Sequence, residues 1–368
     1  MDAIESTHNG NGQHEPISIL GYLLVRINKN VSSKIIIWVC SALMIFKTFY
    51  RLYSIFDPTI SLYDDNIVKY EKIYNQLYAL SLGLILLNFY MDYSMYIKYL
   101  NAYKRIVKNG FDIDSTEYVE KQLKINRLFI KLAFICELAI TGYNNYLNYY
   151  RKLGFRSEMI FLSVTACITQ CSSLIFVQFI IECCIYCQSS FIPLNNSLDI
   201  IIRQNERSID INRIAKLIRL SYDKTTESIR CMDKFLTFVL FAFYSYYIGH
   251  CIFAFGIILS YASSFYFLSF AVLRFLVDAF YLFWVTYHLV RVNQLSIQMF
   301  DKVYRLSFSL DSSHTIATMN EINLFLLRTN RNDVGFTFAG LCMVSPSFVS
   351  SLATISLTLG LALPSFIK

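Results

Sequence analysis

The chain has 368 residues, of which 55% are apolar or aromatic and only 16% are charged, and its formal net charge is +7. Soluble domains carry about 25% charged residues, so the sequence lacks the charged surface that a soluble protein of this length needs. The mean hydropathy of +0.43 agrees with this. Composition excludes a soluble enzyme, a nucleic-acid binder and a disordered scaffold, and it predicts an all-α membrane protein.

Seven stretches are long and apolar enough to cross a bilayer as helices, because a hydrocarbon core of about 30 Å needs roughly 20 such residues. In chain order the predicted spans are Ile35–Ile55, Leu77–Ile97, Leu128–Leu147, Met159–Cys187, Phe235–Leu259, Tyr266–Val290 and Phe348–Phe366.

The distribution of basic residues orients these spans. With a cytoplasmic N-terminus, 23 of the 33 lysines and arginines fall in inner segments and six in outer ones, and the other four lie within spans. Cytoplasmic loops of membrane proteins collect Lys and Arg. The sequence therefore predicts a cytoplasmic N-terminus and an extracellular C-terminus.

The longer inner segments keep a helical pattern, with isoleucine and leucine at helical spacing between charges. This pattern predicts amphipathic helices beneath the membrane, which extend the spans into the cytoplasm. We divide the chain into a cytoplasmic segment (1–34), a six-helix bundle (35–290) that includes the extension 188–234, cytoplasmic anchor helices (291–334) and a last span (335–368).

Motifs for catalysis or metal binding are weak. The five histidines are scattered, and no HExxH, GxSxG, paired CxxC or Walker loop occurs. We therefore expect neither an enzyme nor a resident metal or cofactor. The cluster Cys183, Cys184 and Cys187 could be palmitoylated or bind a metal, but buried thiols acting as small apolar groups fit it better.

Several ionisable residues fall within the predicted spans, where charge is costly and usually functional. Arg274 and Asp278 are four residues apart on one helix face, so they can form an ion pair that serves either the bundle or a site. Glu137, at mid-depth of its span, is the strongest candidate for a group that faces a cavity. Thr141 lies one helical turn further along the same span.

Tyrosines cluster near the outer ends of the spans, which an interfacial aromatic belt also explains. On the fifth span Tyr247, His250 and Phe253 recur every three residues and can line one wall of a pocket for a small organic ligand. The candidate pocket therefore consists of Glu137, Thr141, Tyr247, His250, Phe253, Arg274 and Asp278.

The last span is rich in small and hydroxyl-bearing residues, which suit either close helix packing or the lining of a water-filled pore. Its end, TLGLALPSF, resembles the TYxxxxxQF hallmark of the insect gustatory receptor family. Thr358 and Phe366 match that motif, whereas Leu359 replaces the tyrosine and Ser365 replaces the glutamine.

A second segment, GFTFAGL, resembles the FTaxGhF segment of the same family at Phe336, Thr337 and Gly340. Length, seven spans and an inverted topology are also similar to that family. The chain is identified as a divergent member on this resemblance.

The resemblance implies a ligand-gated, non-selective cation channel in the plasma membrane of chemosensory neurons, in contact with lipid and opened by a small-molecule tastant. It also implies a homo- or hetero-tetramer with other gustatory receptors, joined by the cytoplasmic helices, with the last span lining the pore and no nucleic acid as partner. The residues expected along the pore are Thr358, Leu361, Ser365 and Phe366.

Three other classes remain open. A seven-span G-protein-coupled receptor is opposed by the charge bias. A secondary transporter is supported only by the intramembrane charges and lacks the expected internal repeats. An insect odorant receptor has the same architecture, and the last-span motif favours the gustatory branch.

Overall fold

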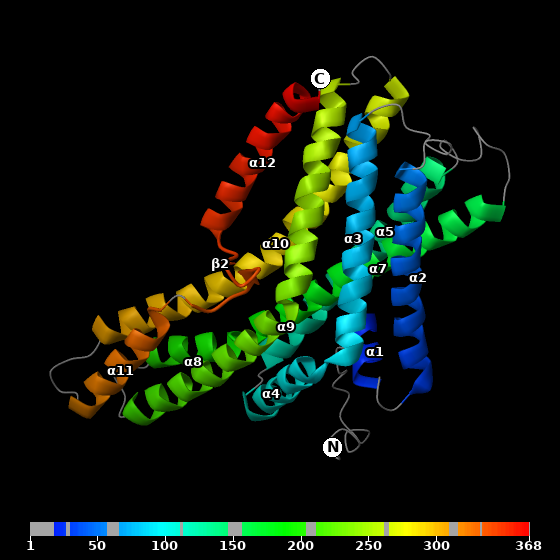
Figure 1. The fold of residues 1–368 in the computed structure, drawn as a ribbon. Helices are drawn as coiled ribbons and strands as arrows, with labels where there is room; N and C mark the ends of the chain where they lie inside the picture. The colour runs from blue at the N-terminus through cyan, green and yellow to red at the C-terminus, as the bar shows by residue number, and fades with distance from the viewer. Residues whose placement is uncertain are drawn as a thin grey trace.

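The computed structural model is built almost entirely from helices (Figure 1). It describes residues 18–26, 30–56, 66–110, 113–145, 157–203, 211–260, 265–308, 316–331 and 333–367, apart from some side chains near the ends of these ranges. The helices are α1 (Ile19–Arg26), α2 (Val31–Phe56), α3 (Asn66–Met91), α4 (Ser94–Gly110), α5 (Ile113–Asn145), α7 (Ser157–Ser189), α8 (Ile192–Arg203), α9 (Ile211–Ser260), α10 (Phe265–Phe308), α11 (Ile316–Thr329) and α12 (Pro346–Ile367).

Within the described ranges, four helical stretches are long and apolar enough to cross a membrane: Val31–Phe56, Ser163–Ile202, Ile211–Leu259 and Leu268–Phe308. The bent pair of α3 and α4 makes a fifth if it forms one span, and α12 is a shorter apolar helix. The predicted third and last spans lie in α5 and α12. The prediction of a helical membrane protein is confirmed.

The second predicted span is broken in the structure. The second predicted span was expected to run to Ile97, but α3 ends at Met91, and α4 leaves at an angle of 68°. The Asp92 carboxylate accepts the Ser94 backbone N–H at 3.0 Å and its hydroxyl at 2.6 Å, so Asp92 caps a new helix. The fourth predicted span, Met159–Cys187, agrees closely with α7, and a turn at Ser190 and Phe191 separates α7 from its extension α8.

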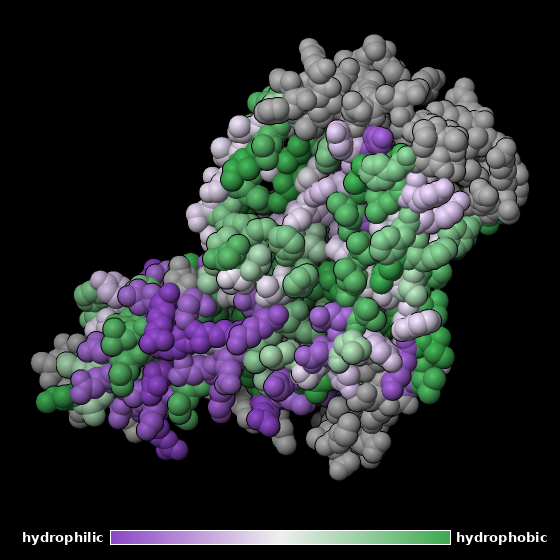
Figure 2. Space-filling view, viewed as in Figure 1, coloured by the Kyte–Doolittle hydropathy of each residue, from purple (hydrophilic) through white to green (hydrophobic). Residues whose placement is uncertain are grey.

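The helices α9 and α10 are much longer than a bilayer is thick. With 50 and 44 residues they reach about 75 and 66 Å at the usual helical rise. Figure 1 shows the N-terminal end of α9 and the C-terminal end of α10 beside α8 and α11, away from α2, α3 and α12. Hydrophilic side chains gather over that same part of the molecule in Figure 2, as expected for helical extensions beneath the membrane.

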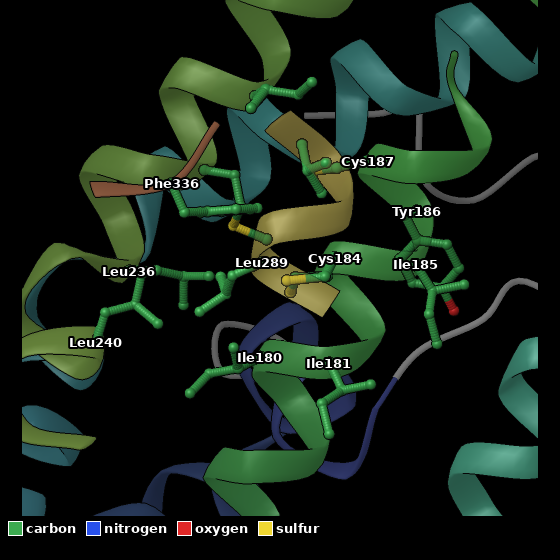
Figure 3. Packing of buried hydrophobic residues seen from close by; sticks show 14 of the residues in the cluster. Ile180, Ile181, Cys184, Ile185, Tyr186, Cys187, Leu236, Leu240, Leu289 and Phe336 are labelled. Carbon is green, nitrogen blue, oxygen red and sulfur yellow. The ribbon is translucent and has the colours of Figure 1, made fainter. Parts of the chain in front are cut away.

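The core centres on α7, which is apolar on all sides and packs against α5, α9 and α10. Ile180, Cys184 and Ile185 are fully buried there. Ile180 and Cys184 lie on the side of α7 towards Leu240 of α9 and Leu289 of α10, whereas Ile185 lies on the other side, beside Tyr186 (Figure 3). Cys183 and Cys187 are buried in the same cluster, and neither is in a disulfide. The sequence-based expectation of buried cysteines that act as small apolar groups agrees with this packing.

A short hairpin joins α11 to α12. Its strands are β1 (Thr337–Phe338) and β2 (Cys342–Met343), and they pair antiparallel with Phe338 opposite Cys342. The turn contains Ala339 at φ 55° and Gly340 at φ 70°, a conformation that glycine adopts without strain. The stretch 335–367 is therefore a hairpin followed by the helix α12, which begins at Pro346.

Candidate ligand site and pore helix

A buried ionic cluster joins four helices in the half of the bundle away from the hydrophilic extensions. Arg274 of α10 donates from Nη1 to Glu137 Oε2 of α5 at 2.7 Å. It also donates from Nε to Asp278 Oδ2 at 3.0 Å, and its Nη2 lies 2.9 Å from Asp278 Oδ1. His250 Nδ1 of α9 lies 2.6 Å from Asp278 Oδ2, and its Nε2 lies 3.4 Å from Glu71 Oε1 of α3.

The cluster is shielded from solvent. Glu137 is 1% exposed, Asp278 0% and His250 4%. Charges in such surroundings require close partners, because an unpaired buried charge is strongly destabilising. The cluster therefore holds α3, α5, α9 and α10 in one arrangement.

Tyrosine side chains pack beside these charges. The Tyr246 ring stacks on Tyr78 with 3.7 Å between ring centroids, and lies 5.3 Å from the His250 ring. Ser173 of α7 links Tyr78 and Tyr247, since its hydroxyl lies 2.9 Å from the first phenol oxygen and 3.1 Å from the second. Aromatic faces thus border the ionic cluster.

The structure brings four of the predicted pocket residues into direct contact: Glu137, His250, Arg274 and Asp278. Tyr247 lies beside them in the tyrosine group. Two predicted residues lie further out. Thr141 is half-buried one turn beyond Glu137 on α5, and Phe253 packs 5.6 Å from the Tyr74 ring.

The sequence did not point to Glu71, Tyr78 or Ser173. Glu71 was assigned to an outer loop because the second span was expected to begin at Leu77, whereas α3 begins at Asn66. The seven-residue spacing of Glu71 and Tyr78 puts both on one helix face, which was the available signal.

A cavity of about 590 Å³ lies elsewhere, between α9, α10 and α12. Its walls are mostly apolar and include Cys251 and Phe255 of α9, Ala279 of α10, and Leu352 and Ser356 of α12. None of the seven predicted pocket residues lines it. Cys251 and Ala279 directly follow His250 and Asp278 in the chain, and successive helical residues point about 100° apart, so they face α12 instead of the cluster.

The last helix, α12, packs against α9 along one stripe only. At Gly360 an added Cβ would lie 2.9 Å from Phe255 of α9, so the two helices are close there. The opposite face carries residues at alternating spacings of four and three, which keeps them on one line. These exposed residues are Ser347, Ser351, Thr354, Thr358 and Leu361.

Threonine hydroxyls on this face are satisfied within the helix. Thr354 donates to the Ser350 carbonyl oxygen at 3.0 Å, and Thr358 donates to the Thr354 carbonyl oxygen at 2.9 Å. Of the predicted pore residues, Thr358 and Leu361 lie on the exposed face. Ser365 continues the same spacing, but its side chain and that of Phe366 lie outside the described residues.

The hairpin before α12 is fixed to α9 and α10. The Asp233 carboxylate of α9 accepts the Thr337 backbone N–H at 2.7 Å and its hydroxyl at 2.9 Å. Asn293 Nδ2 of α10 donates to the Val334 carbonyl oxygen at 3.1 Å, and Phe336 is fully buried. The three positions that matched the gustatory segment therefore each have a structural role. Phe336 lies in the core, Thr337 forms the hydrogen bonds to Asp233 (the hairpin clamp), and Gly340 lies in the turn.

The sequence matches no protein-family profile and no curated protein. Its fold is similar to that of the insect olfactory receptor OR5 from Machilis hrabei in complex with eugenol, with a TM-score of 0.70 and 11% sequence identity over 92% of this chain and 91% of that one. A second structure of that receptor gives a TM-score of 0.63 and 13% identity over 97% of this chain and 92% of the other. The chain thus has the same fold as that olfactory receptor.

Proposed function

We propose that this chain is a subunit of a ligand-gated cation channel in the plasma membrane, opened by a small molecule, and that its role is taste. The fold similarity supports a receptor of the insect chemosensory type, and the motif resemblance in residues 335–366 supports the gustatory branch. An odorant receptor is the second candidate, because the similar solved structure is an olfactory receptor in complex with eugenol.

The observation that carries the channel proposal is the one-sided packing of α12. An apolar helix whose hydroxyl-bearing face is exposed in the single chain suits an oligomer in which several copies surround a water-filled path. Closed symmetry is the usual outcome for identical subunits. Four subunits, identical or mixed with other gustatory receptors, would place Thr358 and Leu361 towards the axis, with Ser365 and Phe366 further along the same helix.

The ionic cluster supports a ligand site in the outer half of the bundle. A ligand opens the channel only if it binds the open arrangement more tightly than the closed one. The cluster fixes α9 and α10, the same two helices that form the cavity wall against α12. A ligand that changes how α9 and α10 pack at the cluster would therefore also change how they hold α12.

The channel and its modality can be tested by patch-clamp of cells that express the full chain, alone and with a gustatory co-subunit. We expect cation currents in response to members of a sugar and bitter panel. Currents evoked only by volatile compounds such as eugenol would assign the chain to odour detection. Saturable uptake without ligand-evoked current would contradict the channel.

The pore face can be tested by cysteine accessibility in the same cells. In Thr358→Cys and Leu361→Cys we expect an aqueous thiol reagent to reduce the current. Ser356→Cys is the matched control, because Ser356 lies on α12 but faces the apolar cavity. Equal protection of all three cysteines, in the closed and the open state, would contradict the assignment of α12 as the pore helix.

A further inference from the structure

The charge balance of the ionic cluster indicates the kind of ligand it accepts. Through the contacts of the described residues, the three carboxylates of Glu71, Glu137 and Asp278 share two cationic partners, Arg274 and His250. Lys72, the next residue after Glu71 on α3, offsets the charge of that carboxylate. Around Glu137 and Asp278, the cluster therefore has more hydrogen-bond acceptors than donors.

Among the described residues, two carboxylate oxygens of this cluster accept no hydrogen bond, Glu137 Oε1 and Asp278 Oδ1, and only Asp278 Oδ1 has the Arg274 guanidinium beside it, at 2.9 Å. Arg274 reaches Glu137 only through Oε2, and Oε1 is buried without a hydrogen-bond partner among the described residues. The Tyr281 hydroxyl, one turn from Asp278 on α10, is likewise buried and unpartnered, and it lies within electrostatic range of Glu137. Buried polar groups normally have partners, so these atoms point to a group that the described residues do not supply.

Both cationic groups of the cluster already have carboxylate partners. The Arg274 guanidinium spans two carboxylates, and both ring nitrogens of His250 face carboxylates. An anionic ligand would have to displace one of these carboxylates and then lie beside the others. The repulsion of like charges in a buried site opposes an anion.

Aromatic rings border the same charges. Tyr246 lies against His250, Tyr247 lies against Tyr281 at 5.7 Å, and Tyr78 stacks on Tyr246. Tyrosine faces attract cations, and rings grouped beside carboxylates form the usual surroundings of bound ammonium groups. An ammonium group has three donors and no acceptor, which matches the unpartnered Glu137 oxygen.

We propose that the ligand of this site is a protonated amine, with its ammonium group bound by Glu137 Oε1 and the neighbouring tyrosines. This inference rests on the proposed function for the link to channel opening, but the binding itself needs only the folded chain. An alkylammonium remains charged at pH 7, since such groups have pKa values near that of lysine, about 10.4.

The experiment uses matched ligands that differ in charge. Three amines, 2-phenylethylamine, tryptamine and hexylamine, are each compared with the corresponding alcohol and carboxylate. The first readout is the thermal unfolding of the purified full chain in detergent, because a ligand that binds the folded state raises its unfolding temperature. We expect at least one amine to stabilise the protein at a concentration about tenfold below its alcohol, with no stabilisation by the carboxylate.

Two variants test which residues bind the amine. Glu137→Gln removes the charge, and we expect it to weaken amine binding about 10- to 100-fold. Tyr281→Phe removes only a hydroxyl and should weaken it less. Glu182→Gln is the matched control, because Glu182 is also a buried glutamate with an unpartnered oxygen, on α7 outside the cluster, and it should leave amine binding unchanged.

The possible outcomes separate this inference from the proposed function. The amine proposal would be overturned if the alcohols or carboxylates stabilised the protein as much as the amines or more. It would also be overturned if none of the ligands stabilised the protein, whatever currents other compounds evoke. Equal loss in Glu182→Gln and Glu137→Gln would overturn the assignment to Glu137. Stabilisation by an amine that evokes no current, alone or with a co-subunit, would support the ligand class and contradict the channel.

Discussion

Two groups of ion pairs in this protein use the same residue types in different surroundings. The ionic cluster around Arg274, called the membrane cluster from here on, joins α3, α5, α9 and α10. Its carboxylates Glu137 and Asp278 are almost fully buried. The second group joins α9 to α11 and to the segment before the hairpin, among hydrophilic side chains. It consists of Arg219 with Glu321, Arg328 with Asp223 and Asp333, and Arg230 with Asp333.

Burial separates the two groups in what they can do. In the second group, the Asp223 and Asp333 side chains are 37% and 34% exposed, so water and salt screen the charges of their pairs. The Arg219–Glu321 pair of this group is more buried, at 22% and 11% exposure. Exposed pairs contribute about 0.2–1 kcal/mol each, whereas removal of one partner from a buried pair costs about 3–5 kcal/mol. The membrane cluster therefore fixes helix positions, and the second group only adjusts them.

Among the substitutions that test this difference between the two groups, Arg274→Gln should have the largest effect on stability. Glu137 and Asp278 would then be buried without their shared cation, and we expect a loss of about 3–5 kcal/mol in unfolding free energy. Thermal unfolding in detergent and the amount of protein at the cell surface both report this loss. A decrease below about 1 kcal/mol would show that the membrane cluster behaves like the exposed pairs.

Asp233→Ala tests an intermediate case, since Asp233 is half-buried and binds the hairpin through two hydrogen bonds. Loss of a charged acceptor costs about 1.5–3 kcal/mol. Because the hairpin leads directly into α12, we also expect a shift in the ligand concentration that half-opens the channel. Thr337→Ser keeps both donors and serves as the control. A loss of stability without any change in gating would limit Asp233 to a role in folding.

Arg328→Gln is the mildest change and sharpens the contrast from the exposed side. We expect it to lower the unfolding free energy by less than about 1 kcal/mol at low salt. Most of that difference should vanish at 1 M salt, where the screening length falls to about 3 Å. The corresponding salt series on Arg274→Gln should show little change. Equal salt dependence of the two variants would contradict the difference in burial.

The membrane-spanning helices were predictable because an apolar run of about 20 residues is typical of a helix that crosses a bilayer. The break at Asp92 was not, since its signal is one capping carboxylate within an otherwise apolar and aromatic stretch. The i, i+4 pairing of Arg274 with Asp278 followed from helical spacing alone. Glu71 and the position of the cavity did not, because they depend on which faces of different helices meet.

The hairpin shows what motif resemblance adds to periodicity. No hydrophobic pattern distinguishes Phe336, Thr337 and Gly340 as a unit, because strands of two residues are too short to show alternation. The resemblance marked these three positions without giving a reason. The reason is their separate contacts: a core position, the two bonds to Asp233 and a backbone angle suited to glycine.

The unbroken course of α9 constrains the length of the sequence itself. Asp233, which holds the hairpin, and His250, which belongs to the membrane cluster, lie seventeen residues apart on this one helix. One inserted or deleted residue between them would turn one contact by about 100° relative to the other and move it about 1.5 Å along the axis. Substitutions in this stretch can be absorbed one at a time, but an insertion or deletion would break the hairpin clamp or the cluster. Among chains that work in the same way, we expect this spacing to vary less than the residues within it.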